Sequence, residues 1–189
     1  MSLRVVLTGS ECTGKTTLAA KLADHYKVTF IPEYLRSYFE QKNGLLTPDD
    51  VIPIARGQLE LEAQAQARGD DPVICDTDII SSIVYAKHYF GICPDWLEEQ
   101  FRLRTPSLYL LCDMDIEWTA DGQRDMGHER EYMQQLFVSE LESRGLAVHR
   151  ISGTAAQRLN KAVLSINQAM SLAQSRSCFS SSRSGLFRS

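Results

Sequence analysis

The sequence predicts an α/β fold in three layers, with a mostly parallel sheet covered on both faces by helices. Short apolar runs, typical of buried strands, alternate with longer stretches in which apolar residues have helical spacing. The runs that indicate strands are residues 3–8, 27–32, 72–76, 107–112 and 146–151. A glycine-rich loop joins the first strand to the first helix, and polar residues follow each strand. In open sheets of this kind, ligands bind beyond the carboxyl ends of the strands.

The expected helices are marked by capping residues and by periodic apolar positions. They lie at about 15–25, 47–68, 78–89, 95–103, 129–143 and 155–171. Thr47 and Pro48 suit the start of the second helix, since threonine caps helices and proline fits their first turn, and Gly69 suits its end. Residues 1–172 are expected to form one domain. Residues 173–189, rich in serine and arginine, are expected to be a mobile tail, because they have too few apolar side chains to offset the entropy of ordering. A partner-binding arm is the alternative for this tail.

The composition is that of an ordinary globular protein. Of 189 residues, 43% are hydrophobic and 23% charged, and the formal net charge is −4. No apolar run approaches the roughly 20 residues of a membrane-spanning helix, and no basic and then apolar leader opens the chain, so a cytoplasmic protein is expected. The negative charge argues against a large basic face for nucleic acid. The five cysteines include no Cys-x-x-Cys pair, so neither a disulfide framework nor a zinc site is indicated.

The loop after the first strand reads Gly-Ser-Glu-Cys-Thr-Gly-Lys-Thr and predicts an ATP or GTP site. Glycine permits the backbone angles with which several N–H groups point at one phosphate chain, and the following helix directs its positive end at the same place. Lys15 is expected at the β and γ phosphates, Thr16 on Mg²⁺ and Thr17 near the α phosphate. The predicted nucleotide contacts are Gly9, Ser10, Glu11, Cys12, Thr13, Gly14, Lys15, Thr16 and Thr17.

Two aspartates follow the third apolar run. Asp76 ends this run as a Walker B aspartate ends its strand, and is expected to hold Mg²⁺ directly or through water. Asp78 is expected to serve the same metal or an acceptor hydroxyl. The alternative is that Asp76 or Asp78 only caps the next helix, a position that aspartate favours.

Glu33 ends the second apolar run and predicts a general base that accepts the proton of an attacking hydroxyl. Asp76 competes for this role. The alternative for Glu33 is a glutamate at a helix start, where the helix dipole favours it.

The segment 113–129 has the features of a lid. Gly122 and Gly127 would be its hinges, and Arg124 and Arg130 would supply the positive charge that phosphoryl transfer needs. The alternative is that both arginines are solvated surface charges.

Four motifs together resemble one family. They are Gly-x-x-x-x-Gly-Lys-Thr, Pro32-Glu33-Tyr34-x-Arg36, Asp76-Thr77-Asp78 and Trp118-x-x-Asp121-Gly122-x-Arg124. The chain is similar, over about residues 3–170, to the ribosylnicotinamide kinase domain of the bacterial NAD-salvage protein NadR and its stand-alone P-loop relatives. The last of the four motifs is the most specific.

The resemblance implies a P-loop nucleoside-kinase-like fold with a five-stranded parallel sheet of order 2-3-1-4-5. It implies transfer of the γ-phosphate of ATP, with Mg²⁺, to the 5′-hydroxyl of nicotinamide riboside. It places Glu33, Tyr34, Asp78 and Asp121 beside the acceptor and makes Asp76 and Asp78 the acidic pair after the strand. It also places Arg124 and Arg130 in the lid, and Gly153 and Thr154 along the adenine.

The sequence departs from the family where nicotinamide-binding members often carry aromatic residues, since Pro32 and Leu59 occupy those positions. The side chains that could supply a ring instead are Tyr34, Tyr38, Tyr85 and Tyr89. The alternatives are a kinase for another nucleoside, nucleotide or cofactor precursor, and a regulatory P-loop ATPase that switches a protein partner. The expected partner is a small nucleoside-like acceptor, and binding to nucleic acid or to a membrane is not expected. The oligomeric state stays open, and a homo-oligomer is one possibility.

Overall fold

The computed structural model describes residues 2–104, 108–116 and 129–183, the last segment with side chains as far as Ser175. Its sheet has four parallel strands in the order β2-β1-β3-β4. The strands are β1 (Arg4–Thr8), β2 (Val73–Asp76), β3 (Leu108–Cys112) and β4 (Val148–Ile151). The predicted α/β class is confirmed.

The prediction of five strands is wrong, because the run 27–32 pairs at one residue. Ile31 donates its N–H to the carbonyl of Ile74 and accepts the N–H of Asp76, both at 2.8 Å, which makes a single parallel bridge beside β2. Pairing along one edge uses alternate residues, so it would resume at Glu33. Glu33 is already the N-cap of a helix, where the chain turns away. The bridge lies next to β2, which is the place that the order 2-3-1-4-5 gives this run.

Seven α-helices and one 3₁₀ turn belong to the part of the chain that the structure describes. They are α1 (Lys15–Tyr26), α2 (Tyr34–Gln41), the 3₁₀ turn η1 (Pro48–Asp50), α3 (Val51–Arg68), α4 (Ile79–Phe90), α5 (Asp95–Arg102), α6 (Arg130–Ser143) and α7 (Ala155–Arg183). Helix α2 was not among the helices expected from the sequence, but the alternative for Glu33, a glutamate at a helix start, agrees with its place as the N-cap of α2. The last helix continues to Arg183 and not to residue 171, so part of the predicted tail is helical.

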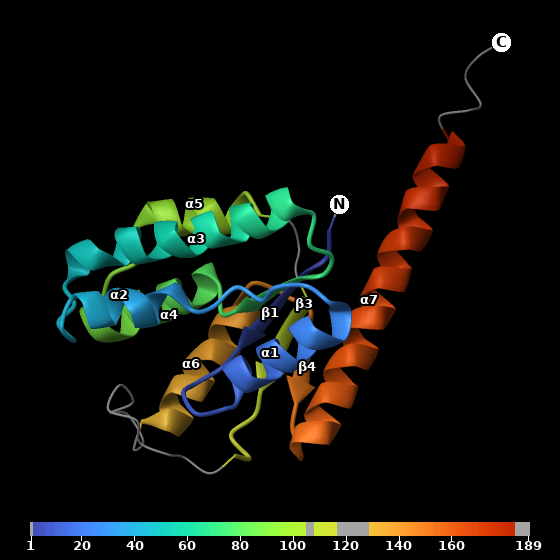
Figure 1. The fold of residues 1–189 in the computed structure, drawn as a ribbon. Helices are drawn as coiled ribbons and strands as arrows, with labels where there is room; N and C mark the ends of the chain where they lie inside the picture. The colour runs from blue at the N-terminus through green and yellow to red at the C-terminus, as the bar shows by residue number, and fades with distance from the viewer. Residues whose placement is uncertain (1, 105–107, 117–128, 184–189) are drawn as a thin grey trace.

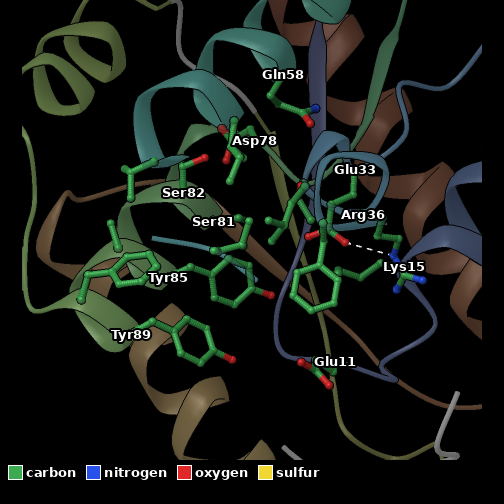
Figure 2. Close-up of a pocket in the computed structure, with 18 residues that line it drawn as sticks. Glu11, Lys15, Glu33, Arg36, Gln58, Asp78, Ser81, Ser82, Tyr85 and Tyr89 are labelled. Carbon is green, nitrogen blue, oxygen red and sulfur yellow. Dashed lines mark hydrogen bonds and ion pairs between the residues drawn. The ribbon is translucent and has the colours of Figure 1, made fainter. Parts of the chain in front are cut away.

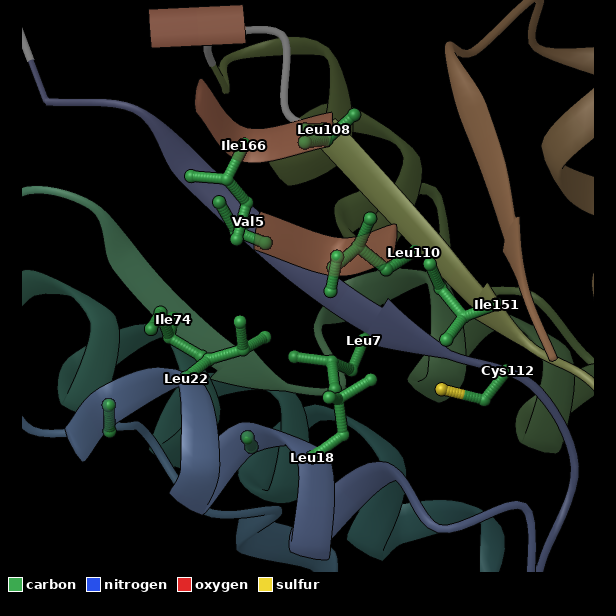
Figure 3. Close-up of a cluster of buried hydrophobic side chains, with 13 residues drawn as sticks. Val5, Leu7, Leu18, Leu22, Ile74, Leu108, Leu110, Cys112, Ile151 and Ile166 are labelled. Atoms are coloured by element: carbon green, nitrogen blue, oxygen red, sulfur yellow. The ribbon is translucent and has the colours of Figure 1, made fainter. Parts of the chain in front are cut away.

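Helices cover both faces of the sheet (Figure 1). On one face Val5, Leu7 and Leu110 pack against Leu22 of α1 and Ile166 of α7, as Figure 3 shows. The opposite face packs against helices α3, α4 and α6, with buried side chains that include Val6, Leu111, Ala65, Val84 and Phe137. Helix α5 packs outside this layer, against α4. This core fixes the carboxyl ends of the strands, where the site lies.

The start that the sequence predicts at Thr47 and Pro48 belongs to the 3₁₀ turn η1, which continues into α3 at Val51. The Thr47 N–H and hydroxyl both donate to the Asp50 carboxylate at 2.9 Å, and Gly69 ends the helix with φ +82°. None of the helices in the described ranges is both long and apolar enough to cross a membrane.

Candidate active site

The phosphate loop (Gly9–Thr16) depends on its two glycines for both angle and space. Gly9 has φ +122°, and a Cβ there would lie 2.9 Å from the carbonyl oxygen of Cys112. Gly14 has φ +76°, and its Cβ would lie 2.7 Å from the Cδ1 atom of Ile116. A side chain at either position would be strained and obstructed. The two glycines therefore let the loop pack closely against the end of β3 and the segment that follows it.

Lys15 is buried and curls over this loop. Its Nζ donates to the carbonyls of Gly9 at 3.0 Å and Ser10 at 2.7 Å. The ammonium group is therefore held at the mouth of the loop, above the N-terminus of α1, where a phosphate would bind.

Thr16 and Asp76 lie together at the end of β2. The Thr16 hydroxyl donates to Oδ2 of Asp76 at 2.5 Å, whereas Oδ1 of Asp76 is buried and has no hydrogen-bond partner among the described residues. Mg²⁺ prefers oxygen ligands and keeps several waters or phosphate oxygens. An unsatisfied carboxylate oxygen beside a hydroxyl fits this ion, and within the described residues no cluster of three or more acidic, histidine or cysteine side chains offers a metal site of another kind.

Asp78 is occupied by contacts within the protein. Its Oδ1 accepts the N–H of Ile80 at 3.0 Å, which caps α4. Its Oδ2 accepts the Tyr109 hydroxyl at 2.7 Å and lies 3.5 Å from Nη2 of Arg4. The capping alternative therefore holds for Asp78, although its side chain still borders the cavity described next. The two aspartates divide the roles that the sequence left open, since Asp76 faces Thr16 and Asp78 begins the helix.

A cavity of about 410 Å³ opens beside the phosphate loop and leads from Lys15 to helices α2, α3 and α4 (Figure 2). Glu33 lies on its wall, with Oε2 3.2 Å from Nε of Arg36. Burial raises the pKa of Glu33; the charge of Asp76 adds to this rise, while Lys15 and Arg36 oppose it. A carboxyl group with a raised pKa beside the loop has the position and basicity of a general base.

Four aromatic side chains from the described part of the chain line the cavity. They are Phe39, Tyr85, Tyr89 and Phe90. Figure 2 shows the rings of Tyr85 and Tyr89 side by side, and their centroids are 6.0 Å apart. Burial raises the pKa of the Tyr85 hydroxyl well above its usual range, so this group stays protonated and can donate a hydrogen bond. These two tyrosines, both on α4, are the ones that the structure brings to the cavity.

Tyr34 has a different place from the one predicted. Its ring packs on α3, where a Cβ added at Gly57 would lie 2.2 Å from it, and its N–H donates to Oε1 of Gln58 at 2.9 Å. Among the described residues, neither Tyr34 nor Tyr38 lines the cavity. Tyr34 therefore anchors the start of α2, and with it Glu33, against α3. The Glu-Tyr motif combines one cavity residue with one packing residue.

Arg130, the first residue of α6, lies against the phosphate loop. Its Nε donates to the carbonyl of Glu11 at 3.2 Å, and its Nη2 to those of Cys12 at 3.1 Å and Ile116 at 3.0 Å. The predicted lid falls largely outside the described residues, and with it lie Asp121, Arg124 and the two hinge glycines.

Gly153 and Thr154 form the turn between β4 and α7, on the other side of the phosphate loop from the cavity. Gly153 has φ +103°, and its N–H donates to the Asp115 carboxylate. The Thr154 N–H donates to Oε1 of Gln157 at 2.8 Å, directly before α7 begins at Ala155. Thr16 and Thr17 are exposed at the start of α1, where a ligand can reach them.

Sequence reasoning missed two buried polar residues that hold the phosphate loop. Gln134 of α6 accepts the Ser10 N–H at 2.7 Å and donates to the carbonyl of Cys112 at 3.0 Å. Arg158 of α7 donates to the carbonyl of Thr13 at 2.7 Å. The signal was a polar residue on the inward face of an expected helix, where an apolar one would fit the period.

The fold and the loop define a P-loop protein. The first strand of a parallel sheet runs into a Gly-x-x-x-x-Gly-Lys-Thr loop at a helix start, and an aspartate ends the neighbouring strand. A profile of the family described as AAA domain matches residues 4–158. The chain belongs to this family.

Relatives with curated descriptions point to the predicted resemblance. The chain is 29% identical over 153 residues to the trifunctional NAD biosynthesis/regulator protein NadR of Escherichia coli K12. The aligned region covers 78% of this chain and 37% of that protein. The NadR of Salmonella typhimurium LT2 is 28% identical over 148 residues, with 75% and 36% covered. The chain thus spans little more than a third of the length of the curated relatives it matches.

Solved structures agree in fold. A crystal structure of NadR protein in complex with NR superimposes with a TM-score of 0.77 at 24% identity, over 88% of this chain and 50% of that one. A NadR complex with NAD and AMP-PNP gives a TM-score of 0.69 at 24% identity, over 88% and 49%. A thymidylate kinase from Ehrlichia chaffeensis gives 0.63 at 19% identity, over 89% and 98%. The predicted likeness to the NadR-type kinase domain is confirmed.

Proposed function

We propose that this chain is an ATP-dependent small-molecule kinase that phosphorylates the 5′-hydroxyl of nicotinamide riboside. The observation that carries the proposal is one cavity that joins Lys15 of the phosphate loop to the Glu33 carboxyl and to a wall of aromatic rings. The similarity to NadR, and the likeness in fold to NadR structures with NR and with AMP-PNP, support the same reading.

The residues suit an in-line phosphoryl transfer. The phosphate loop and Lys15 would hold the β and γ phosphates, and Glu33, with its raised pKa, would accept the proton of the attacking hydroxyl. Thr16 and Asp76 would hold Mg²⁺, which neutralises phosphate charge when it is bound. Arg130 brings a positive charge to the same loop. Arg124 keeps the lid role, and Asp121 the role beside the acceptor, that the resemblance implies for them.

The charges of the cavity favour an acceptor that carries no phosphate. Lys15 and Arg36 are the basic residues among the described side chains that line it, and Arg36 is paired with Glu33. Glu11, Glu33 and Asp78 add carboxylates. A nucleotide would bring two negative charges to these groups, whereas a pyridinium nucleoside carries a positive ring that aromatic faces attract.

The rings that would hold the base come from positions other than those of the nicotinamide-binding relatives. Pro32 is exposed and Leu59 packs among α3, α4 and α5, and within the described part of the chain neither lines the cavity. Tyr85, Tyr89, Phe39 and Phe90 take their place. Because these rings tolerate any flat base, another nucleoside or cofactor precursor is the second candidate acceptor.

The test is ADP formation with Mg-ATP and a panel of acceptors, namely nicotinamide riboside, nicotinic acid riboside, uridine, thymidine and thymidine monophosphate. We expect nicotinamide riboside to give the largest kcat/KM and the monophosphate the smallest, and Lys15→Ala to abolish turnover. Preference for thymidine monophosphate would overturn the charge argument. If no acceptor stimulates ATP turnover and only a protein partner does, the protein is a regulatory ATPase and not a kinase.

A further inference from the structure

Arg158 links three loops at the carboxyl edge of the sheet. Its side chain is buried, and it donates to the carbonyls of Thr13 after β1 at 2.7 Å, Asp113 after β3 at 2.8 Å and Gly153 after β4 at 3.1 Å. It also pairs with the carboxylate of Asp115. One guanidinium group therefore holds the ends of three neighbouring strands in a fixed relation.

The turn that leads into α7, the helix of Arg158, is held by several contacts. Gly153 needs its positive φ, and a Cβ there would lie 2.5 Å from Oε1 of Gln157. The Gly153 N–H donates to the Asp115 carboxylate, which also accepts from Arg158. The backbone of Arg158 is fixed as well, by donation of its N–H to the Thr154 carbonyl at 2.9 Å. A displacement of this turn would therefore be transmitted to the phosphate loop.

The order of the strands places the cavity and the turn at Gly153 on opposite flanks of β1. The cavity with Glu33 is beside β2, on one flank of β1, and the turn at Gly153 follows β4, on the other. If the γ-phosphate meets its acceptor at the cavity, the nucleoside part of the donor has to leave the phosphate loop toward β3 and β4. There it passes Ile116 and Arg158, the two side chains that a Cβ on Gly14 would meet at 2.7 and 3.8 Å.

We propose that Arg158 is a positioning residue that couples contacts made by the base of the donor to the placement of its phosphates. The inference rests on the proposed function, since it requires a nucleoside triphosphate as donor. Binding free energy from a non-reacting part of a substrate accelerates a reaction only when the protein transmits it to the reacting centre. The Arg158 bonds to Gly153 and Thr13 are the direct path for that transmission.

Arginine suits this task better than lysine. Its planar group has five N–H donors in a fixed fork, whereas lysine has one nitrogen on a flexible stem. Arg158 uses Nε, Nη1 and Nη2 at once, each on a different carbonyl. Lysine would keep the charge beside Asp115 and lose the link between loops, so Arg158→Lys separates the two roles.

The test compares ATP with ribose 5′-triphosphate, a donor that lacks the base, at saturating acceptor. In the wild type we expect ATP to have the much larger kcat/KM. In Arg158→Lys we expect kcat/KM for ATP to fall about 100-fold, because small misplacements of reacting groups cost that much, while ribose 5′-triphosphate loses less than 3-fold and the KM of the acceptor is unchanged. The matched control is Arg150→Lys, at an exposed arginine that pairs with Asp113 at 3.3 Å, and it should leave both donors unaffected.

Each other result has a distinct meaning. If Arg158→Lys lowers kcat/KM equally for the two donors, Arg158 has only a structural role and the coupling is overturned. An unchanged ratio of kcat/KM between ATP and ribose 5′-triphosphate would overturn it as well. If Arg158→Lys does not fold, Asp115→Asn tests the same link from the carboxylate side and should lower the ATP preference in the same direction. A wild type that uses neither donor would refute the proposed function itself.

Discussion

Gly57→Ala probes how α3 positions Glu33, the proposed general base. Alanine is favoured over glycine in a helix interior by about 1 kcal/mol, so this change in mid-helix would ordinarily stabilise the protein. Here the added Cβ would lie 2.2 to 2.5 Å from ring atoms of Tyr34. The ring has to retreat by roughly 1 Å or more to reach ordinary carbon contact near 3.5 Å. Overpacking of this kind costs about 1–3 kcal/mol. We therefore expect a net loss of about 1 kcal/mol in the free energy of unfolding.

The assay is urea unfolding of a double-mutant cycle. In a Tyr34→Ala background the ring is gone, so Gly57→Ala should become stabilising by about 1 kcal/mol, a change of sign and a coupling of about 2 kcal/mol. In the wild-type background the same substitution should also lower kcat/KM for the acceptor, since Tyr34 directly follows Glu33, and leave the KM for ATP nearly unchanged. An equal effect of Gly57→Ala on stability with and without the Tyr34 ring would show that the ring does not set the outcome.

Three further predictions concern the chemistry of the site. Lys15→Ala should abolish phosphoryl transfer and leave the far-UV circular dichroism spectrum intact, and any retained turnover would remove Lys15 from the mechanism. Arg36→Gln should raise the pKa of Glu33 further, because Arg36 favours its ionised form; the acid limb of the kcat/KM profile should then move to higher pH, and an unmoved limb would contradict Glu33 as the base. Mg-ATP should slow alkylation of Cys12, mapped by mass spectrometry, and leave Cys93 as an unprotected control; equal protection of both would contradict nucleotide binding at the loop.

The sequence determined those parts of the protein that rest on local rules. The Gly-x-x-x-x-Gly-Lys-Thr loop predicts its own conformation, because Gly9 and Gly14 are the residues that tolerate its angles, and the lysine and threonine follow at fixed offsets. The expected helices at 15–25 and 78–89 likewise match α1 and α4 to within one residue at each end. The expected helix at 47–68 matches α3 at its end but not at its start, because residues 48–50 form the 3₁₀ turn η1.

The tertiary structure decided what depends on contacts between distant segments. Whether 27–32 pairs as a strand depends on where Glu33 must begin a helix, and whether Tyr34 or Tyr85 reaches the cavity depends on how α2 and α4 pack on α3. Arg158 lies 145 residues from the carbonyl of Thr13 that it binds, and sequence spacing carries no signal of such a contact. Local propensity depends on a few neighbouring residues, whereas the direction of a buried side chain depends on all the residues that pack around it.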